Sequence, residues 1–132
     1  MKKIFIDSNV LIDFLLDREP YAVFATEILT IAHQGEIQAF VSSLAFSHMF
    51  YLCRKNLGKT ETLTRLKKLN KIVTVLPVHE ETISDALVAD FSDFEDAIQY
   101  HCSAQEKNMG ASIANNIKYF SKVEIPVMTA KT

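Results

Sequence analysis

The residues best suited to chemistry in this chain are acidic, and they fall in two separate segments. Asp7 directly follows a short apolar run, and three more acids lie in the segment Asp93-Phe94-Glu95-Asp96. Carboxylates that are forced together repel one another, so such a group is normally stabilised by a hard cation with oxygen ligands. Mg²⁺ or Mn²⁺ at such a site can activate a water molecule and stabilise charge on a phosphodiester. The chemistry that we expect is therefore metal-dependent hydrolysis of a phosphodiester.

Short apolar runs alternate along the chain with segments of helical spacing. Strands are predicted over 4–6, 38–41, 72–76 and 111–114, with a fifth candidate over 127–128. Helices are predicted over 10–16, from about 21 to 33, and over 44–55, 59–71, 80–89 and 97–107, the last closed by Gly110. This alternation predicts an α/β domain in which helices cover both faces of a parallel sheet of four to five strands. Ligands in such folds collect beyond the carboxyl ends of the strands, where Asp7, the 93–96 segment and Asn116 would all project.

The predicted helix over 59–71 is amphipathic and follows Gly58, which separates it from the helix before. Leu63, Leu66 and Leu69 are expected to face the core. The outer surface would carry the most basic stretch of the chain, formed by Arg65, Lys67, Lys68 and Lys71. Such a cluster is usually a solvated helix face, although it could also contact RNA phosphates or an acidic partner.

Composition and length place limits on the class of protein. With 132 residues, 48% of them hydrophobic and 23% charged, the chain is expected to form a single domain over 1–132. A net charge of -2 provides no general attraction for polyanions, so nucleic-acid binding would need a local basic patch or a bound cation. Cys53 and Cys102 are expected to be reduced, packed thiols, which favours a cytoplasmic protein. We find neither a secretory signal nor a membrane span in the sequence.

The two acidic segments carry recognisable motifs, the first of which is Ile4-Phe5-Ile6-Asp7-Ser8-Asn9-Val10-Leu11-Ile12-Asp13. It is similar to the first strand and turn of the PIN-domain family of small metal-dependent nucleases. There the aspartate at the position of Asp7 binds metal, and Asn9 would orient it. The segment 93–100 is similar to the third family motif, in the branch with an Asp-Phe-Glu-Asp sequence, and places a second metal-directed acid at Asp96. The resemblance implies a three-layer α/β/α fold.

Other positions depart from the family pattern. In the segment 112–120, Asn116 and Phe120 fit the last motif, whereas Tyr119 stands where a fourth acid is expected. His48 occupies a place where many PIN domains have glutamate. Asp7 and Asp96 are therefore the predicted catalytic pair and, with Asp93, the predicted metal ligands. The predicted supporting residues are Asn9, Asp13, His48, Glu95 and Asn116.

The resemblance implies a Mg²⁺- or Mn²⁺-dependent endoribonuclease that cuts single-stranded RNA. It also implies a toxin of a bacterial toxin-antitoxin pair, with an antitoxin partner and a homodimeric state. The departures leave open a catalytically impaired PIN-like module that binds nucleic acid or protein. A phosphatase similar to the haloacid dehalogenases is a weaker alternative, because the second aspartate of its nucleophile loop is absent after Asp7.

Each candidate residue also has a purely structural interpretation. Asp7 could simply cap the helix that follows it. Asp93 and Asp96 could oppose the dipole of the next helix without any metal. His48 could be a hydrogen-bonded structural histidine, while Asp13 and Glu95 could be solvated or ion-paired groups at the surface.

Overall fold

The computed structural model describes residues 1–114 and 127–129, which contain one parallel sheet. Its strands are β1 (Lys2–Ile6), β2 (Ile37–Ser42), β3 (Thr74–Leu76), β4 (Met109–Ala114) and β5 (Val127–Thr129). They lie in the order β3-β2-β1-β4-β5, and every neighbouring pair is parallel. The prediction of a parallel sheet with four to five strands is confirmed.

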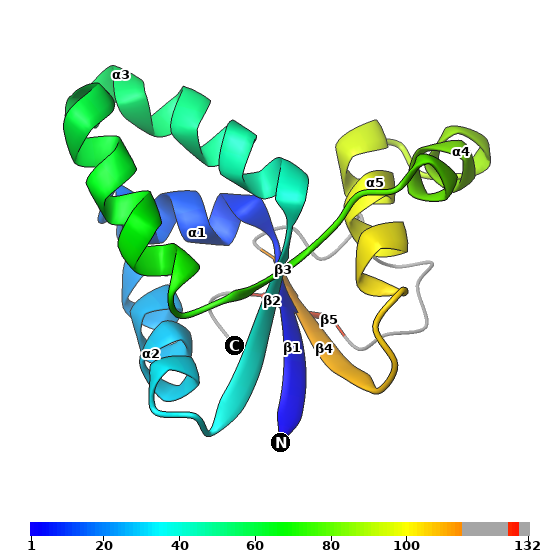
Figure 1. Ribbon diagram of the computed structural model, residues 1–132, viewed down its shortest axis with the longest axis horizontal. Coiled ribbons are helices and arrows are strands. Elements are labelled where there is room, and N and C mark those ends of the chain that lie inside the picture. The colour runs from blue at the N-terminus through cyan, green and yellow to red at the C-terminus, as the bar shows by residue number, and fades with distance from the viewer. Residues whose placement is uncertain (115–126, 130–132) are drawn as a thin grey trace.

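Helices cover both faces of this sheet. They are α1 (Ser8–Leu15), α2 (Tyr21–His33), α3 (Ser43–Asn70), α4 (Glu80–Val88) and α5 (Phe94–Ser103). Figure 1 shows α1, α2 and α3 on one side of the sheet and α4 and α5 on the other. This is the three-layer α/β/α arrangement that the sequence predicts. Within the part of the chain described, no helix combines the length and hydrophobicity needed to cross a membrane.

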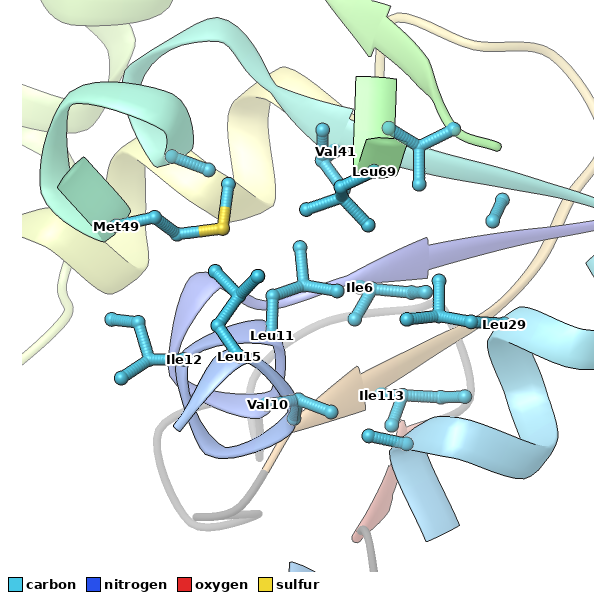
Figure 2. Packing of buried hydrophobic residues seen from close by; sticks show 14 of the residues in the cluster. Ile6, Val10, Leu11, Ile12, Leu15, Leu29, Val41, Met49, Leu69 and Ile113 are labelled. Carbon is cyan, nitrogen blue, oxygen red and sulfur yellow. The ribbon is translucent and has the colours of Figure 1, made fainter. Parts of the chain in front are cut away.

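The central strand β1 is buried on both of its faces. Ile4 and Ile6 pack into the larger core cluster beneath α1, α2 and α3, whereas Phe5 packs on the opposite face with Phe40 and Cys102. Because side chains alternate along a strand, a strand covered on both faces is apolar at successive positions. Figure 2 shows the larger cluster, in which Ile6 and the other strand residues meet side chains from the helices.

The order of the strands places a switch point beside β1. From β1 the chain proceeds to β2 and β3 on one side, and later to β4 and β5 on the other. The backbone N–H of Asp7 donates to the carbonyl oxygen of Ile113 at 2.9 Å, which joins the ends of β1 and β4. In open α/β sheets the crevice at such a reversal is the usual ligand site. Asp7 lies at this crevice.

Gly58 divides α3 into the two helical segments that the sequence predicts. Its φ of 78° and ψ of 166° are not helical, and this backbone conformation favours glycine. In the second segment Thr62, Leu66 and Leu69 are buried. The prediction that Leu63 faces the core is wrong, because Leu63 is 37% exposed. Thr62 takes the buried position, and its hydroxyl donates to the carbonyl oxygen of Gly58 at 2.7 Å.

The predicted end of the helix over 97–107 is also wrong. α5 ends at Ser103, and Gly110 lies inside β4 rather than after the helix. A Cβ at Gly110 would lie 3.1 Å from the carbonyl oxygen of Lys3. The glycine is therefore needed for the close approach of β4 to β1, and not to terminate a helix.

Strand β3 is shorter than predicted, because residues 72 and 73 lie in the turn that follows α3. The backbone N–H groups of Ile72 and Val73 both donate to the carbonyl oxygen of Leu69, at 2.9 and 3.1 Å. Apolar content alone does not separate such a turn from the strand that follows it.

Leu11 tests the contribution of the larger core cluster. It is completely buried on α1, so Leu11→Ala should lower the free energy of unfolding by about 2 to 5 kcal/mol. Urea unfolding followed by circular dichroism measures the effect. Leu87→Ala, at a position 67% exposed on α4, is the control and should change stability by less than about 0.5 kcal/mol. Equal losses in the two variants would contradict this description of the core.

Candidate active site

Asp7 links the end of β1 to two other parts of the molecule. It is the N-cap of α1, and its Oδ2 accepts a hydrogen bond from the backbone N–H of Asn9 at 3.3 Å. Its Oδ1 accepts a hydrogen bond from the Nε2 of Gln99 on α5 at 2.6 Å. Asp7 does cap a helix, as its structural interpretation proposed, but the second contact ties it to the opposite layer.

Helix α5 brings Asp96 to the same crevice. Asp93 is its N-cap, with Oδ1 accepting from the backbone N–H of Asp96 at 3.0 Å. Asp96 and Gln99 are both buried, and residues three apart on a helix lie on one face. Because Gln99 contacts Asp7, this face of α5 is turned toward the end of β1. Asp7 and Asp96, far apart in the sequence, therefore lie on the same rim of the sheet.

The electrostatics of the two aspartates agree with this placement. Burial raises the pKa of Asp7 to about 6, and the negative charge of Glu95 adds to the effect. Burial also raises the pKa of Asp96 to about 7, helped by the negative charges of Asp7, Asp93 and Glu95. Each carboxylate thus lies in surroundings that disfavour its charge, which a bound cation would relieve.

The available side chains fit a hard cation that needs few ligands from the protein. Within residues 1–114 and 127–129, no three His, Cys, Asp or Glu side chains are grouped closely enough to hold a metal ion by themselves. Mg²⁺ commonly uses one or two protein carboxylates and completes its shell with water. Asp7 and Asp96 supply carboxylate oxygens of this kind.

His48 joins a hydrogen-bonded network beside the aspartates. Its Nδ1 lies 3.0 Å from the Oγ of Ser8 and 3.7 Å from the Oε1 of Glu95. The Oγ of Ser8 also accepts from the Nε2 of Gln99 at 3.3 Å. A chain of contacts therefore runs from His48 through Ser8 and Gln99 to Asp7. His48 and Glu95, both predicted as supporting residues, lie together at this site.

The remaining predicted residues have different positions. Asp13 lies near the end of α1 and is buried, with its Oδ1 2.9 Å from the Nε of Arg18. Asn9 is exposed, and its contact with Asp7 comes from its backbone N–H. Asn116 and Tyr119 lie outside the described residues. Arg65, from the predicted basic cluster, uses Nη1 to donate to the carbonyl oxygen of Leu15 at 2.6 Å and pairs with Glu61.

Two residues of the network have no role in the sequence analysis. Gln99 lies within the motif segment 93–100, and its spacing of three from Asp96 was a usable signal that the two share a helix face. Ser8 directly follows Asp7, but a serine at a helix start is ordinarily interpreted as a capping residue. Its contact with His48 depends on the packing of α3 against α1, which no local pattern predicts.

Comparison with known proteins identifies the family to which this chain belongs. The family model described as "PIN domain" matches residues 3–109, which include most of β1, all of α5 and both aspartates. The chain therefore belongs to the PIN-domain family, and the resemblance inferred from the sequence is confirmed. No curated protein sequence matches the chain significantly.

Solved structures support the same fold. VapBC from Salmonella typhimurium bound to DNA superposes with a TM-score of 0.70 at 15% identity, covering 98% of this chain and 99% of that one. VapC20 from Mycobacterium tuberculosis, described as a sarcin-ricin loop cleaving toxin, gives a TM-score of 0.70 at 13% identity, with 91% and 95% covered. A toxin-antitoxin complex from Klebsiella pneumoniae gives 0.68 at 18% identity, with 96% and 97% covered. At these identities the likeness establishes the fold.

The raised pKa values predict how stability depends on pH without metal. The ordinary pKa of 3.8 for aspartate rises to about 7 at Asp96, so the folded state binds this proton more tightly than the unfolded state. The resulting stabilisation is complete below about pH 4 and is lost as pH rises through about 7. Asp96→Asn should therefore stabilise the protein progressively between pH 4.5 and 8, relative to the wild type.

Urea unfolding in EDTA at several pH values measures this difference. Glu36→Gln is the control, since Glu36 is exposed and lies outside the site. Its difference from the wild type should stay nearly constant with pH. A constant difference for Asp96→Asn as well would show that burial does not disfavour the charge of Asp96.

Proposed function

We propose that this PIN domain is a metal-dependent endoribonuclease that cleaves single-stranded RNA. The observation that carries the proposal is the buried acidic pair, Asp7 and Asp96, at the switch point of the sheet. Both carboxyl groups have raised pKa values, and both lie near the negative charge of Glu95. Strongly perturbed acids in such a crevice are typical of functional sites.

Asp7 and Asp96 would hold Mg²⁺ or Mn²⁺. Asp93, predicted as a further ligand, does not form a group of three with them in the part of the chain that the structure describes. The ion, when bound, supplies an activated water molecule and stabilises charge on the phosphodiester. Gln99 and the backbone N–H of Asn9 fix the carboxylate of Asp7 by two hydrogen bonds. Asp93 holds the start of α5 through Oδ1, which leaves its Oδ2 as an acceptor.

His48 stands at the acidic position of many PIN domains and contacts Ser8 instead. In the proposed enzyme it has a supporting role, because its imidazole reaches the aspartates through Ser8 and Gln99. The electrostatic effect of His48 lowers the pKa of Asp7, against the larger effect of burial, and thereby favours the ionised, metal-binding form.

Cleavage assays test the catalytic assignment. Purified protein with Mn²⁺ or Mg²⁺ should cut a labelled single-stranded RNA, and EDTA should stop the reaction. Asp7→Asn and Asp96→Asn should each lower the rate by roughly 100-fold or more, since each removes a charged ligand at the reacting centre. Product bands on a denaturing gel measure the rate.

Glu36→Gln is again the control and should cleave like the wild type. If the double variant Asp7→Asn, Asp96→Asn cleaves as fast as the wild type, the proposed active site is wrong. Saturable RNA binding that needs no metal, without any cleavage, would instead support the binding-module alternative, which the histidine at position 48 favours.

We further propose that the chain is the toxin of a bacterial toxin-antitoxin pair, acting in the cytoplasm as a homodimer. The support is the fold shared with VapBC and other toxin-antitoxin structures over nearly the full length of both chains.

Induced expression in a bacterial host should stop growth, and Asp7→Asn should restore it. Co-expression of the protein encoded by the adjacent gene should also restore growth and yield a complex on size exclusion. Growth arrest by both forms would contradict a toxicity based on catalysis.

A further inference from the structure

A cavity of about 430 Å³ opens directly beside the acidic pair. Three of its lining residues, Ser8, Glu95 and Gln99, are those that surround the two aspartates. The other side of the cavity is formed by the first turns of α3, with His48 and Tyr51. Its volume falls within the range of about 300 to 1,000 Å³ that is usual for small-molecule sites. The cavity therefore adjoins the proposed reaction centre.

Two aromatic rings line this cavity and remain half exposed. Tyr51 on α3 is 53% exposed, and Phe94 at the start of α5 is 48% exposed. They are the only aromatic side chains among the large hydrophobic residues that the described part of the chain leaves exposed. The two rings thus reach the same cavity from α3 and α5, which lie on opposite faces of the sheet (Figure 1). Proteins that bind single-stranded nucleic acid use such aromatic rings as surfaces on which unpaired bases stack.

Positive charge accompanies the tyrosine. The Nζ of Lys55 lies 4.9 Å from the centre of the Tyr51 ring, and the Cζ of Arg54 lies 5.5 Å from it. Both cations are exposed, and neither forms an ion pair with the residues that the structure describes. They can therefore contact a phosphate of a strand whose base occupies the cavity. This local patch supplies the attraction for polyanions that the net charge does not.

The polar residues of the lining suit the edge of a base rather than an aliphatic chain. Ser47 and His48 carry a hydroxyl and an imidazole, and Glu95 carries a carboxylate. These groups donate and accept hydrogen bonds, whereas Leu44 and Ile98 supply apolar surface around them. Aromatic, polar and apolar groups in one concave site are the combination that holds a base by stacking and by its edge.

We propose that this cavity binds one unpaired nucleobase of the RNA strand, stacked against Tyr51 and Phe94, next to the phosphodiester that is cut. The inference rests on the proposed function and adds a substrate subsite to it. It also agrees with the proposed specificity for single strands, because a base inside a duplex is not free to enter a cavity.

Binding without cleavage tests the subsite. The probe is a fluorescein-labelled single-stranded RNA of six nucleotides, mixed with the full chain in low-salt buffer containing EDTA and followed by fluorescence anisotropy. Tyr51→Ala and Phe94→Ala should each weaken binding by roughly 5- to 100-fold, the loss expected for one stacked base. Tyr51→Phe keeps the ring and should bind within about twofold of the wild type.

Leu87→Ala is the matched control, since Leu87 is exposed on α4 and does not line the cavity. It should bind like the wild type, and thermal unfolding checks that every variant folds. A second probe of equal length, whose sugars carry no bases, should bind the wild type as weakly as the intact probe binds Tyr51→Ala. Undiminished binding by both alanine variants, equal binding of the two probes, or no binding by the wild type would overturn the inference.

The subsite and the nuclease activity can fail separately. If Asp7→Asn stops cleavage while Tyr51→Ala and Phe94→Ala bind RNA like the wild type, the proposed function stands and the subsite is wrong. If base-dependent binding requires both rings and the wild type cuts no RNA with Mn²⁺, the subsite stands and the hydrolysis is wrong.

Discussion

The hydrogen bond between Gln99 and Asp7 is the contact on which the site depends. It joins residues 92 apart in the sequence and connects the end of the central strand with the helix layer on one face. A buried carboxylate without a partner would be costly, because burial removes its hydration. The amide of Gln99 offsets part of this cost without cancelling the charge. Asp7 is therefore held in place and remains able to attract a cation.

The same arrangement concentrates negative charge that the protein does not neutralise. Asp13 pairs with Arg18, and Glu95 lies 3.7 Å from the Nδ1 of His48, whereas Asp96 lies among like charges. A structural ion pair would normally place a cationic side chain beside a carboxylate this well buried. The described residues place none beside Asp96 close enough to lower its pKa. This asymmetry separates the candidate site from ordinary buried acids and favours an external ion as the missing charge.

The sequence predicted the layers and the family, but it did not predict how the site is connected. Alternating apolar runs and helical spacing were sufficient for the parallel sheet, because β1 and β2 are buried on both faces. The motif segment likewise located Asp96 correctly at the start of α5. Leu63 and Gly110 were misassigned because their roles depend on tertiary neighbours, namely the polar Thr62 in the core and the backbone of Lys3. The contacts of Ser8 with His48 and of Gln99 with Asp7 cross between layers, so no local pattern encodes them.

The position of β1 at the centre of the sheet has a consequence for synthesis of the chain. Strand β1 is translated before the five helices α1 to α5, yet one of its neighbours in the sheet, β4, is translated after all of them. Pairings between such distant segments form slowly, because the entropy of closing a long loop is lost before the contacts between the strands can stabilise the chain. The acidic pair cannot assemble until α5 has been translated and β4 has docked beside β1. A nascent chain that still lacks α5 and β4 therefore carries no assembled acidic pair, even where its earlier elements have already folded.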